Sequence, residues 1–207
     1  MKKIISITSF SDGEGKTMTS FYLAKFLNRN NIGSVLMIET DSDLPLTKLI
    51  SLHTYKTHQR VHITSALSID KLLKIIKHAY NDYIIIDTHN NNHINKLTKV
   101  AIAQSDMVIC LSTLDNWGTV GLGLAVNTIT DYNPVAPVYI IINTNRFEES
   151  GQRALIEQIR RQPKITLMRP FIPKIASPHI SILTLIASNS LPRLSNTYQQ
   201  IFSQLKF

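Results

Sequence analysis

The sequence predicts an α/β protein built on a doubly wound, mostly parallel β-sheet that is flanked by helices on both faces, a three-layer arrangement. Short apolar segments rich in β-branched residues alternate with helical patterns along the whole chain. Segments such as Tyr-Ile-Ile-Ile-Asp at 83–87 are apolar on both faces, as strands buried beneath two helical layers must be. The chain shows no internal repeat and no linker, so residues 1–207 are expected to form one domain.

The expected elements follow in chain order. Short apolar runs with high β-propensity predict strands at residues 3–8, 34–38, 61–64, 83–87, 107–111, 138–142 and 165–168. Apolar residues that recur three or four positions apart predict helices at residues 17–28, 46–52, 69–80, 94–103, 120–130 and 149–160, with two more at 181–187 and 196–205. This alternation is what predicts the parallel sheet.

Composition narrows the class of protein. The chain has 207 residues, enough for one domain with a full core, and it has no apolar run long enough to span a bilayer. Its start leads into a strand rather than a secretory signal, so a cytoplasmic protein without stable membrane insertion is expected. The single cysteine, Cys110, excludes an internal disulfide. The net charge of +8 favours polyanionic partners such as nucleic acid, with a role in solubility as the alternative.

The segment from Ser11 to Thr17, Ser-Asp-Gly-Glu-Gly-Lys-Thr, is the clearest functional signal. It follows an apolar strand and opens a helix, which is the order that a phosphate-binding loop requires. Glycines let the backbone approach phosphate oxygens, and the helix N-terminus supplies N–H donors and a positive dipole end. Lys16 would reach the β- and γ-phosphates, and the Thr17 hydroxyl would hold Mg²⁺. The usual pattern has a further Gly where this chain has Phe10, and an ordinary strand-to-helix turn is the alternative.

Carboxylates end two of the predicted strands. Glu39-Thr40-Asp41 follows one apolar run, and Asp87 follows another. In such sheets ligands bind at the carboxyl ends of the strands. A buried acid is costly to desolvate unless a cation or hydrogen bonds compensate, and Mg²⁺ held by Thr17 and Asp87 would do so. The alternative is that the acids cap the following helices, and it applies to Asp41 and Asp43 in particular.

Together these motifs resemble the ParA/MinD superfamily of deviant Walker A P-loop ATPases, especially its small, ParF-like plasmid-partition members. The resemblance extends over essentially the full length of the chain. It rests on the loop at 11–17, on Val-Leu-Met-Ile-Glu-Thr-Asp at 35–41, and on Tyr-Ile-Ile-Ile-Asp-Thr at 83–88, which resembles Walker B. Three further stretches resemble family segments: 103–108, which leads into a core strand, 141–146 at the adenine side, and 170–173 in the last nucleotide-contacting loop.

The resemblance implies the fold of a P-loop NTPase, with ATP and Mg²⁺ as its ligands. It assigns Mg²⁺ to Thr17 and Asp87, and catalysis to Lys16 together with Glu39 and Asp41, one of which would position the attacking water. The residues that it assigns to the nucleotide are Asp12, Gly13, Glu14, Gly15, Lys16, Thr17, Met18, Asn143, Arg146 and Pro173. It further implies a nucleotide-dependent homodimer, binding to non-specific DNA, a centromere-binding or adaptor partner protein, and a nucleoid-associated location in the cytoplasm.

The chain departs from the family pattern in two places, the start of the loop and the second acidic motif. The family loop reads Lys-Gly-Gly-x-Gly-Lys-Thr, and its first Lys reaches the nucleotide of the partner in a dimer, whereas this chain has Ser11 followed by Asp12. A cation is therefore replaced, and an anion is placed close to the phosphates. Glu39 stands where the family usually has Asp. Because phosphoryl transfer depends on positioning, nucleotide binding is predicted and the rate of hydrolysis is left open.

Three other features have both a functional and a structural interpretation. His89 and His93 would form a metal-ligand pair on a helix, but the Asn run between them predicts a loop. The apolar C-terminal stretch 201–207 is short and predicts packing against the domain rather than membrane binding. The basic residues late in the chain are either the DNA surface that the resemblance implies or a solvated face: Arg146, Arg153, Arg160, Arg161, Lys164, Arg169, Lys174 and Arg193.

The sequence therefore leads to the hypothesis of a small ParA-like ATPase that acts in segregation of plasmid or mobile-element DNA. The rival hypothesis is a weakly or non-hydrolysing, nucleotide-dependent adaptor that recruits a conjugation, DNA-processing or positioning complex, and Ser11 and Glu39 favour it. Bacterial tyrosine kinases resemble the loop as well, but they typically carry a Tyr-rich tail, whereas the last 14 residues here contain only Tyr198. Weak C-terminal amphipathicity disfavours MinD-like membrane positioning.

Overall fold

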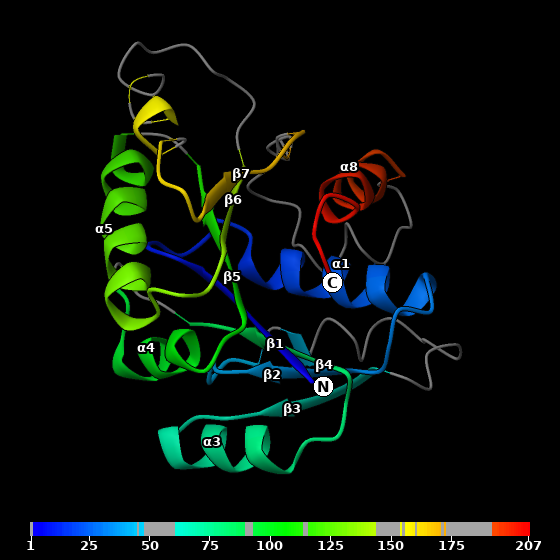
Figure 1. Cartoon of the computed structure of the whole chain (residues 1–207). Coiled ribbons are helices and arrows are strands. Elements are labelled where there is room, and N and C mark those ends of the chain that lie inside the picture. Colours follow the sequence, from blue (N-terminus) through cyan, green and yellow to red (C-terminus); the bar gives the residue numbers. More distant parts are fainter. Residues whose placement is uncertain are drawn as a thin grey trace.

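A seven-stranded parallel sheet in the order β3-β2-β4-β1-β5-β6-β7 forms the centre of the fold (Figure 1). The computed structural model describes residues 2–44, 46–47, 61–89, 93–113, 116–143, 154, 156–159, 161–170, 172 and 192–207. The strands are β1 (Lys3–Ser9), β2 (Val35–Glu39), β3 (Val61–Ser65), β4 (Tyr83–Asp87), β5 (Met107–Ser112), β6 (Val138–Ile142) and β7 (Ile165–Leu167). Every pairing between these strands is parallel, which confirms the predicted doubly wound sheet.

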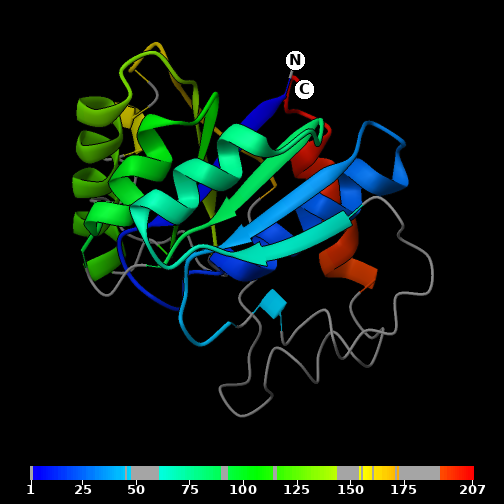
Figure 2. The same ribbon diagram turned by 90° about the horizontal axis from the view of Figure 1, so that it is seen from below.

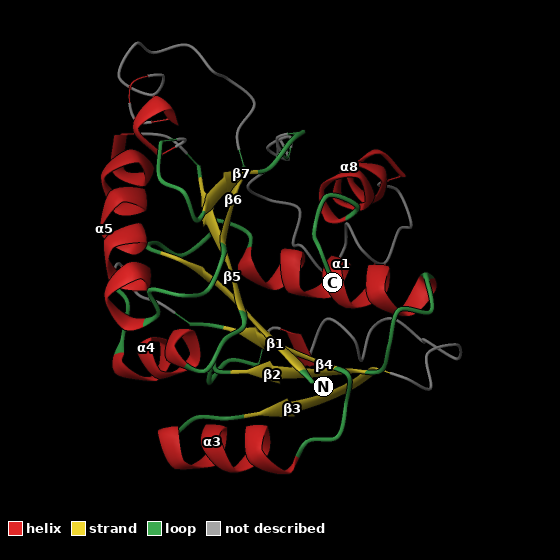
Figure 3. Ribbon diagram, in the orientation of Figure 1, coloured by secondary structure: helices red, strands yellow, loops and turns green. Residues whose placement is uncertain are grey.

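Helices cover both faces of the sheet (Figure 3). They are α1 (Lys16–Arg29), α3 (Ile69–His78), α4 (Lys96–Ala103), α5 (Asn116–Tyr132) and α8 (Pro192–Phe202). Helices α1 and α8 pack together on one face, and α3, α4 and α5 lie on the other. Side chains alternate across β1, so Ile5 and Ile7 join the core beneath α1 and α8 while Ile4 joins the opposite core.

Several helix boundaries differ from the predicted ones for local reasons. Helix α8 begins at Pro192 rather than at 196, because the fixed φ of proline suits the first helical position. Helix α4 begins after Asn95, whose side chain accepts a hydrogen bond from the Thr98 N–H at 2.9 Å. Helix α5 begins at Asn116, before a glycine-rich stretch that weakens its helical pattern. Residues 46–47, 154 and 156–159 are helical as predicted, and the predicted helix at 181–187 lies outside the described residues.

The topology fixes where a ligand can bind. Strand β1 lies between β4 and β5 at the centre of the sheet, and the chain changes direction across the sheet at this point. In open α/β sheets this change leaves a crevice at the carboxyl ends of the strands. The loop after β1 and the ends of β2, β4 and β5 all meet at that edge, which is where the predicted site residues lie.

The C-terminal stretch packs against the domain, as the sequence predicts. Ile201 and Phe202 are fully buried, and Phe207 packs between Phe26 and Tyr83. The Lys3 Nζ donates a hydrogen bond to the Lys206 carbonyl at 2.7 Å, and Figures 1 and 2 place the two ends of the chain side by side. The apolar C-terminal residues therefore complete the core between α1, α8 and the sheet.

Candidate nucleotide site

The loop between β1 and α1 has the backbone geometry of a phosphate cradle. Gly13 and Gly15 have positive φ values of 75° and 97°, a region that residues with a Cβ rarely adopt. A Cβ added at Gly15 would lie 3.1 Å from the Asn143 Nδ2. Gly15 is also the N-cap of α1, so the free N–H groups of the first helical turn point into the loop. The arrangement is ready to receive an anion.

Lys16 lies inside this loop with its ammonium surrounded by oxygen atoms. The side chain is buried, and Nζ donates to the Ser9 Oγ at 3.0 Å, the Ser11 carbonyl at 3.2 Å and the Asp12 Oδ1 at 3.3 Å. Asp12 is half-exposed, so this ion pair is well solvated. Phosphate oxygens can replace these partners without leaving the ammonium unsatisfied.

Glu14 has a bracing role that its sequence position does not reveal. Its carboxylate accepts the Ser11 N–H at 3.2 Å and the Thr113 N–H at 3.3 Å, and its carbonyl accepts the Asn143 Nδ2 at 3.2 Å. Burial raises the pKa of Glu14, and the two backbone hydrogen bonds oppose that rise. The side chain therefore ties the loop to the residue that follows β5.

Asp87 ends β4 as a buried carboxyl group beside the start of α1. The Ser20 Oγ donates to its Oδ1 at 3.0 Å, and the Thr17 hydroxyl is hydrogen-bonded to the same carboxyl group. Burial raises the pKa of Asp87 to about 7, against the opposing effect of these hydroxyls and of the Lys16 charge. A carboxylate beside a threonine hydroxyl is the kind of oxygen pair that Mg²⁺ prefers, and a cation would stabilise the ionised form. The residues present therefore fit a magnesium ion.

Glu39 lies next to Asp87 across the β2–β4 pairing, but its carboxylate has other partners. It is fully buried and accepts hydrogen bonds from the Leu46 N–H, from the Thr47 N–H at 3.3 Å and from the Thr47 Oγ1 at 2.8 Å. These contacts make Glu39 the cap of the helical turn at 46–47. Capping of the following helix was one of the two interpretations of the acids at the strand ends. In the structure Glu39 is the acid that caps the turn at 46–47.

Asp41 connects the loops that follow β2 and β4. Its Oδ2 lies 3.0 Å from the His89 Nδ1, and its Oδ1 accepts the Asp43 N–H at 2.9 Å. The His89 N–H donates to the Thr40 Oγ1 at 2.9 Å, and that hydroxyl donates to the Asp87 carbonyl at 3.1 Å. A change at Asp87 can therefore reach both loops through consecutive hydrogen bonds.

The remaining predicted nucleotide contacts divide into two groups. Asn143 lies at the end of β6, where its N–H donates to the Ser112 carbonyl at 2.8 Å and its side chain contacts the loop at Glu14. Met18 has its side chain in the core beneath α1, which leaves its backbone N–H as the group facing the loop side of the helix. Arg146 and Pro173 lie outside the described residues.

The chain matches a family model described as the CobQ/CobB/MinD/ParA nucleotide binding domain over residues 5–177. It belongs to this family. The ParA/MinD resemblance drawn from the motifs is thereby confirmed. No curated protein matches the chain at a significant level of sequence similarity.

Solved structures of members of the ParA/MinD group share the fold along almost the whole chain. A plasmid partition protein from Borrelia burgdorferi, crystallised with AMPPNP, is 21% identical with a TM-score of 0.69, and 98% of each chain is covered. The MinD cell division protein of Aquifex aeolicus is 18% identical with a TM-score of 0.70, covering 98% of this chain and 96% of its own. The pNOB8 ParA bound to non-specific DNA is 14% identical with a TM-score of 0.65, covering 97% and 96%. At these identities the likeness establishes the three-layer fold.

The histidines in the described part of this ParA/MinD chain form no metal centre. The described residues contain no group of three or more His, Cys, Asp or Glu side chains that could hold a metal ion. His89 instead pairs with Asp41, as described above. No helix in the described part of the chain is long and apolar enough to cross a membrane.

The basic residues that the sequence grouped late in the ParA/MinD chain are only partly described. Arg161, Lys164 and Arg169 are exposed, and the Lys164 Nζ donates to the Pro134 carbonyl. The side chain of Arg193 and the residues Arg146, Arg153, Arg160 and Lys174 lie outside the description. Sequence reasoning missed two basic side chains on α1, Lys25 and Arg29, because their helix was interpreted only through its phosphate-binding end.

Proposed function

We propose that the chain is a ParA-like ATPase of one domain, residues 1–207, that serves in partition of plasmid or mobile-element DNA. ATP binds at the β1–α1 loop with Mg²⁺ held by Thr17 and Asp87. Nucleotide binding promotes a homodimer that associates with non-specific DNA. A partner protein, bound to a centromere-like site or acting as an adaptor, stimulates release. The protein works in the cytoplasm at the nucleoid.

The observation that carries this proposal is the meeting of three features at one helix N-terminus. Gly15 holds the positive φ that lets the backbone approach a phosphate, the Lys16 ammonium lies inside the loop, and the Thr17 hydroxyl bonds to the buried Asp87. A helix dipole, a cation and a magnesium-type oxygen pair together match a nucleoside triphosphate with its metal ion. An ordinary strand-to-helix turn needs none of them.

The residues have separate tasks in the proposed hydrolysis of ATP to ADP and phosphate. Lys16 neutralises charge on the transferred phosphoryl group, and α1 orients the phosphates through its first N–H groups. Asp41 or Glu39 positions the attacking water, although Glu39 already accepts the Leu46 and Thr47 N–H groups. Magnesium supplies charge neutralisation between the phosphates when it is bound. Asn143 holds the loop from the side of β6. The proposal also assigns Asn143, Arg146 and Pro173 to nucleotide binding.

The comparisons support the proposal at the level of family and fold. The plasmid partition protein crystallised with AMPPNP and the ParA bound to non-specific DNA share the fold of this chain. The net charge of +8 is of the sign that DNA binding requires. The two likenesses and the sign of the charge support a DNA-associated ATPase.

One experiment tests the proposal. ATP binding and hydrolysis, and the gel shift of random duplex DNA with and without ATP, are measured for the unchanged protein, for Lys16→Ala and for Lys74→Ala. Lys74 is an exposed lysine on α3, on the opposite face of the sheet from α1, so it controls for loss of one charge. We expect Lys16→Ala to lose turnover and ATP-dependent DNA binding, and Lys74→Ala to retain both. Absence of ATP binding in the unchanged protein would refute the proposal.

The adaptor hypothesis remains the second candidate because of specific contacts. The Glu39 oxygens are engaged by Leu46 and Thr47, which removes them in part from water positioning. Asp12 contacts the Lys16 ammonium that would act in catalysis. Ser11 stands where the family signature has a cation. Tight ATP binding with no hydrolysis in the presence of DNA would establish the adaptor in place of the ATPase.

A further inference from the structure

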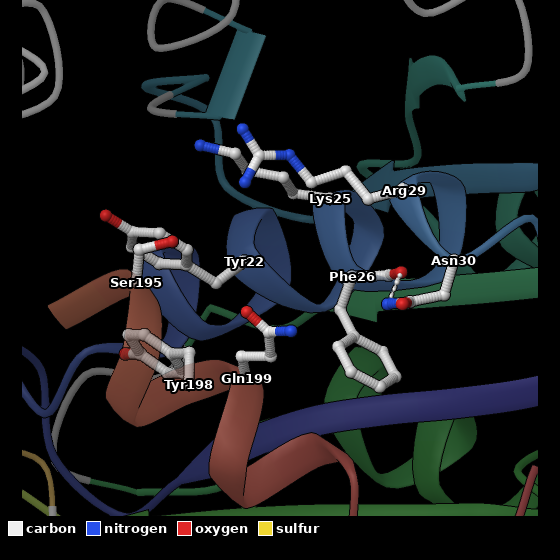
Figure 4. A pocket seen from close by; sticks show the side chains of 8 residues that line it. All are labelled: Tyr22, Lys25, Phe26, Arg29, Asn30, Ser195, Tyr198 and Gln199. Atoms are coloured by element: carbon white, nitrogen blue, oxygen red, sulfur yellow. Dashed lines mark hydrogen bonds between the residues drawn. The ribbon is translucent and has the colours of Figure 1, made fainter. Parts of the chain in front are cut away.

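A cavity lies between α1 and α8, well away from the nucleotide loop. It has a volume of about 160 Å³, and its lining comes from two helices that are distant in sequence: Tyr22, Lys25, Phe26, Arg29 and Asn30 from α1, with Ser195, Tyr198 and Gln199 from α8 (Figure 4). At the helical rise of about 1.5 Å per residue, Lys25 and Arg29 lie roughly 14 and 20 Å along α1 from Lys16. This cavity and the loop are therefore separate sites.

The lining of the cavity includes two cations, Lys25 and Arg29, that have no acidic partner among the residues the structure describes. Lys25 and Arg29 are one helical turn apart on the same face of α1, and Figure 4 shows both side chains extending to the same side. Within the described part of the chain, neither side chain forms an ion pair or donates a hydrogen bond. Burial lowers the pKa of Lys25, and the nearby charge of Arg29 lowers it further. Two neighbouring positive charges without a described counterion repel each other and attract an anion.

Local structural roles account for these residues only in part. Arg29 lies in the last turn of α1, where a cation complements the helix dipole. The Lys25 Nζ lies 5.7 Å from the centre of the Tyr22 ring and 6.0 Å from that of Phe21. Neither role uses the N–H donors of the two groups, and neither explains why both face one cavity.

The rest of the lining suits a phosphate group. Tyr22 and Tyr198 are stacked with their ring centres 4.6 Å apart and form an aromatic wall, and the Tyr198 hydroxyl is already engaged with the Thr19 Oγ1 at 3.0 Å. Ser195 and Gln199 add a hydroxyl and an amide to the same lining. Arg, Lys, Ser and Gln side chains are those that bind phosphate oxygens in nucleic-acid complexes. The volume is well below the roughly 300–1,000 Å³ of pockets that enclose a drug-sized ligand, so it fits one group rather than a whole nucleotide.

We propose that the α1–α8 cavity binds a phosphate group between Lys25 and Arg29, with Ser195 and Gln199 as additional donors. The group is either a backbone phosphate of DNA or the phosphate of a small free molecule, since both offer the same oxygens. The site lies outside the nucleotide loop. If the bound group is a phosphate of DNA, the inference rests on the proposed DNA binding and locates part of it; a small phosphate compound goes beyond the proposed function.

A labelling experiment on the full-length protein locates the bound group. The protein is treated with limiting acetic anhydride, and acetylation of each lysine is read by mass spectrometry with no ligand, with a random 30-base-pair duplex, and with 1 mM pyrophosphate. We expect acetylation of Lys25 to fall at least threefold with one of the two probes, while the α3 lysines Lys74 and Lys77 do not change. Protection by duplex alone identifies DNA, and protection by pyrophosphate identifies a small phosphate compound. Unchanged Lys25 acetylation with both probes overturns the proposal.

A matched pair of variants tests the same site by affinity. We expect K25Q/R29Q to bind the protecting probe at least tenfold more weakly than K74Q/K77Q, which removes the same charge from the opposite face of the sheet. If the probe is DNA, the slope of log affinity against log salt should also decrease by about 0.9, because the contact to one phosphate is lost. Equal affinities of the two double variants overturn the proposal. Acetylation of Lys16 with and without ATP reports separately on the nucleotide loop, so failure of one site does not imply failure of the other.

Discussion

Replacement of Asp87 by asparagine should change how the stability of the protein depends on pH. The folded protein holds this carboxyl group with a pKa of about 7, whereas the unfolded chain exposes it with its ordinary value of 3.8. Between these two values the folded state keeps a proton that the unfolded state has lost. The contribution of Asp87 therefore favours folding at low pH and is lost as the pH rises toward 7 and above. Asparagine keeps the shape, and its oxygen still accepts the Ser20 hydroxyl, but it does not titrate.

The size of the effect follows from the difference between the two pKa values. One pKa unit corresponds to about 1.4 kcal/mol, and most of the interval between 3.8 and 7 lies above pH 5. From pH 5 to pH 8 the unchanged protein should therefore lose about 2–3 kcal/mol of unfolding free energy relative to Asp87→Asn. The comparison with the variant matters because other groups, including the buried Glu14 with its raised pKa, also contribute to the pH dependence of both proteins.

The assay is urea unfolding followed by circular dichroism at pH 5, 6, 7 and 8, without nucleotide or metal. Asp70→Asn serves as the matched control, since it removes one exposed carboxylate from the first turn of α3. We expect the free-energy difference between the unchanged protein and Asp87→Asn to vary with pH, and the difference for Asp70→Asn to stay constant. A difference that is flat from pH 5 to pH 8 would show that Asp87 is ionised in the folded state, and the argument for a proton at this position would fail.

Three further changes test the loop and its neighbours. Gly15→Ala should lower ATP affinity more than tenfold in a binding titration, because the φ of 97° at Gly15 disfavours a residue with a Cβ. Gly123→Ala on α5 is the control and should leave ATP affinity unchanged, since an added Cβ there has nothing within 4 Å. Asp12→Gly should raise ATP affinity several-fold, because it removes the anion that contacts Lys16; an unchanged affinity would contradict this role. Glu39→Gln should cost about 1–3 kcal/mol in urea unfolding, because the buried N–H groups it caps lose an acceptor, and a cost near zero would contradict the capping role.

The fold could be predicted because its signal lies within short windows of sequence. The run at 83–87 is apolar on both faces, and the structure buries every one of its residues. The phosphate loop could also be predicted, since two glycines with positive φ, a lysine and a threonine lie within residues 13–17. Each of these signals depends on residues that are neighbours in the chain, so no knowledge of tertiary contacts is needed to find it.

The roles of the buried acids depend on contacts that sequence does not encode locally. Glu14 accepts the N–H of Thr113, which lies 99 positions away, and Asp41 contacts a histidine from the loop after another strand. The α1–α8 cavity requires the stacking of Tyr22 on Tyr198 near the end of the chain. Such pairs arise from the order of strands in the sheet and from helix packing, and a hydrophobic pattern fixes neither at the level of single side chains.

The charges around Lys16 explain why a metal ion should bind at Asp87 rather than at its neighbour Glu39. Glu39 is buried, but backbone N–H groups at 46–47 stabilise its negative charge. Asp87 is buried beside it, its carboxyl group accepts only hydroxyl hydrogen bonds among those the structure describes, and its pKa is raised to about 7. A triphosphate brings further negative charge to this edge, which one lysine and a helix dipole do not balance. A divalent cation that takes the place of the Asp87 proton stabilises the carboxylate and the phosphates together, so metal and nucleotide binding at this loop should be mutually dependent.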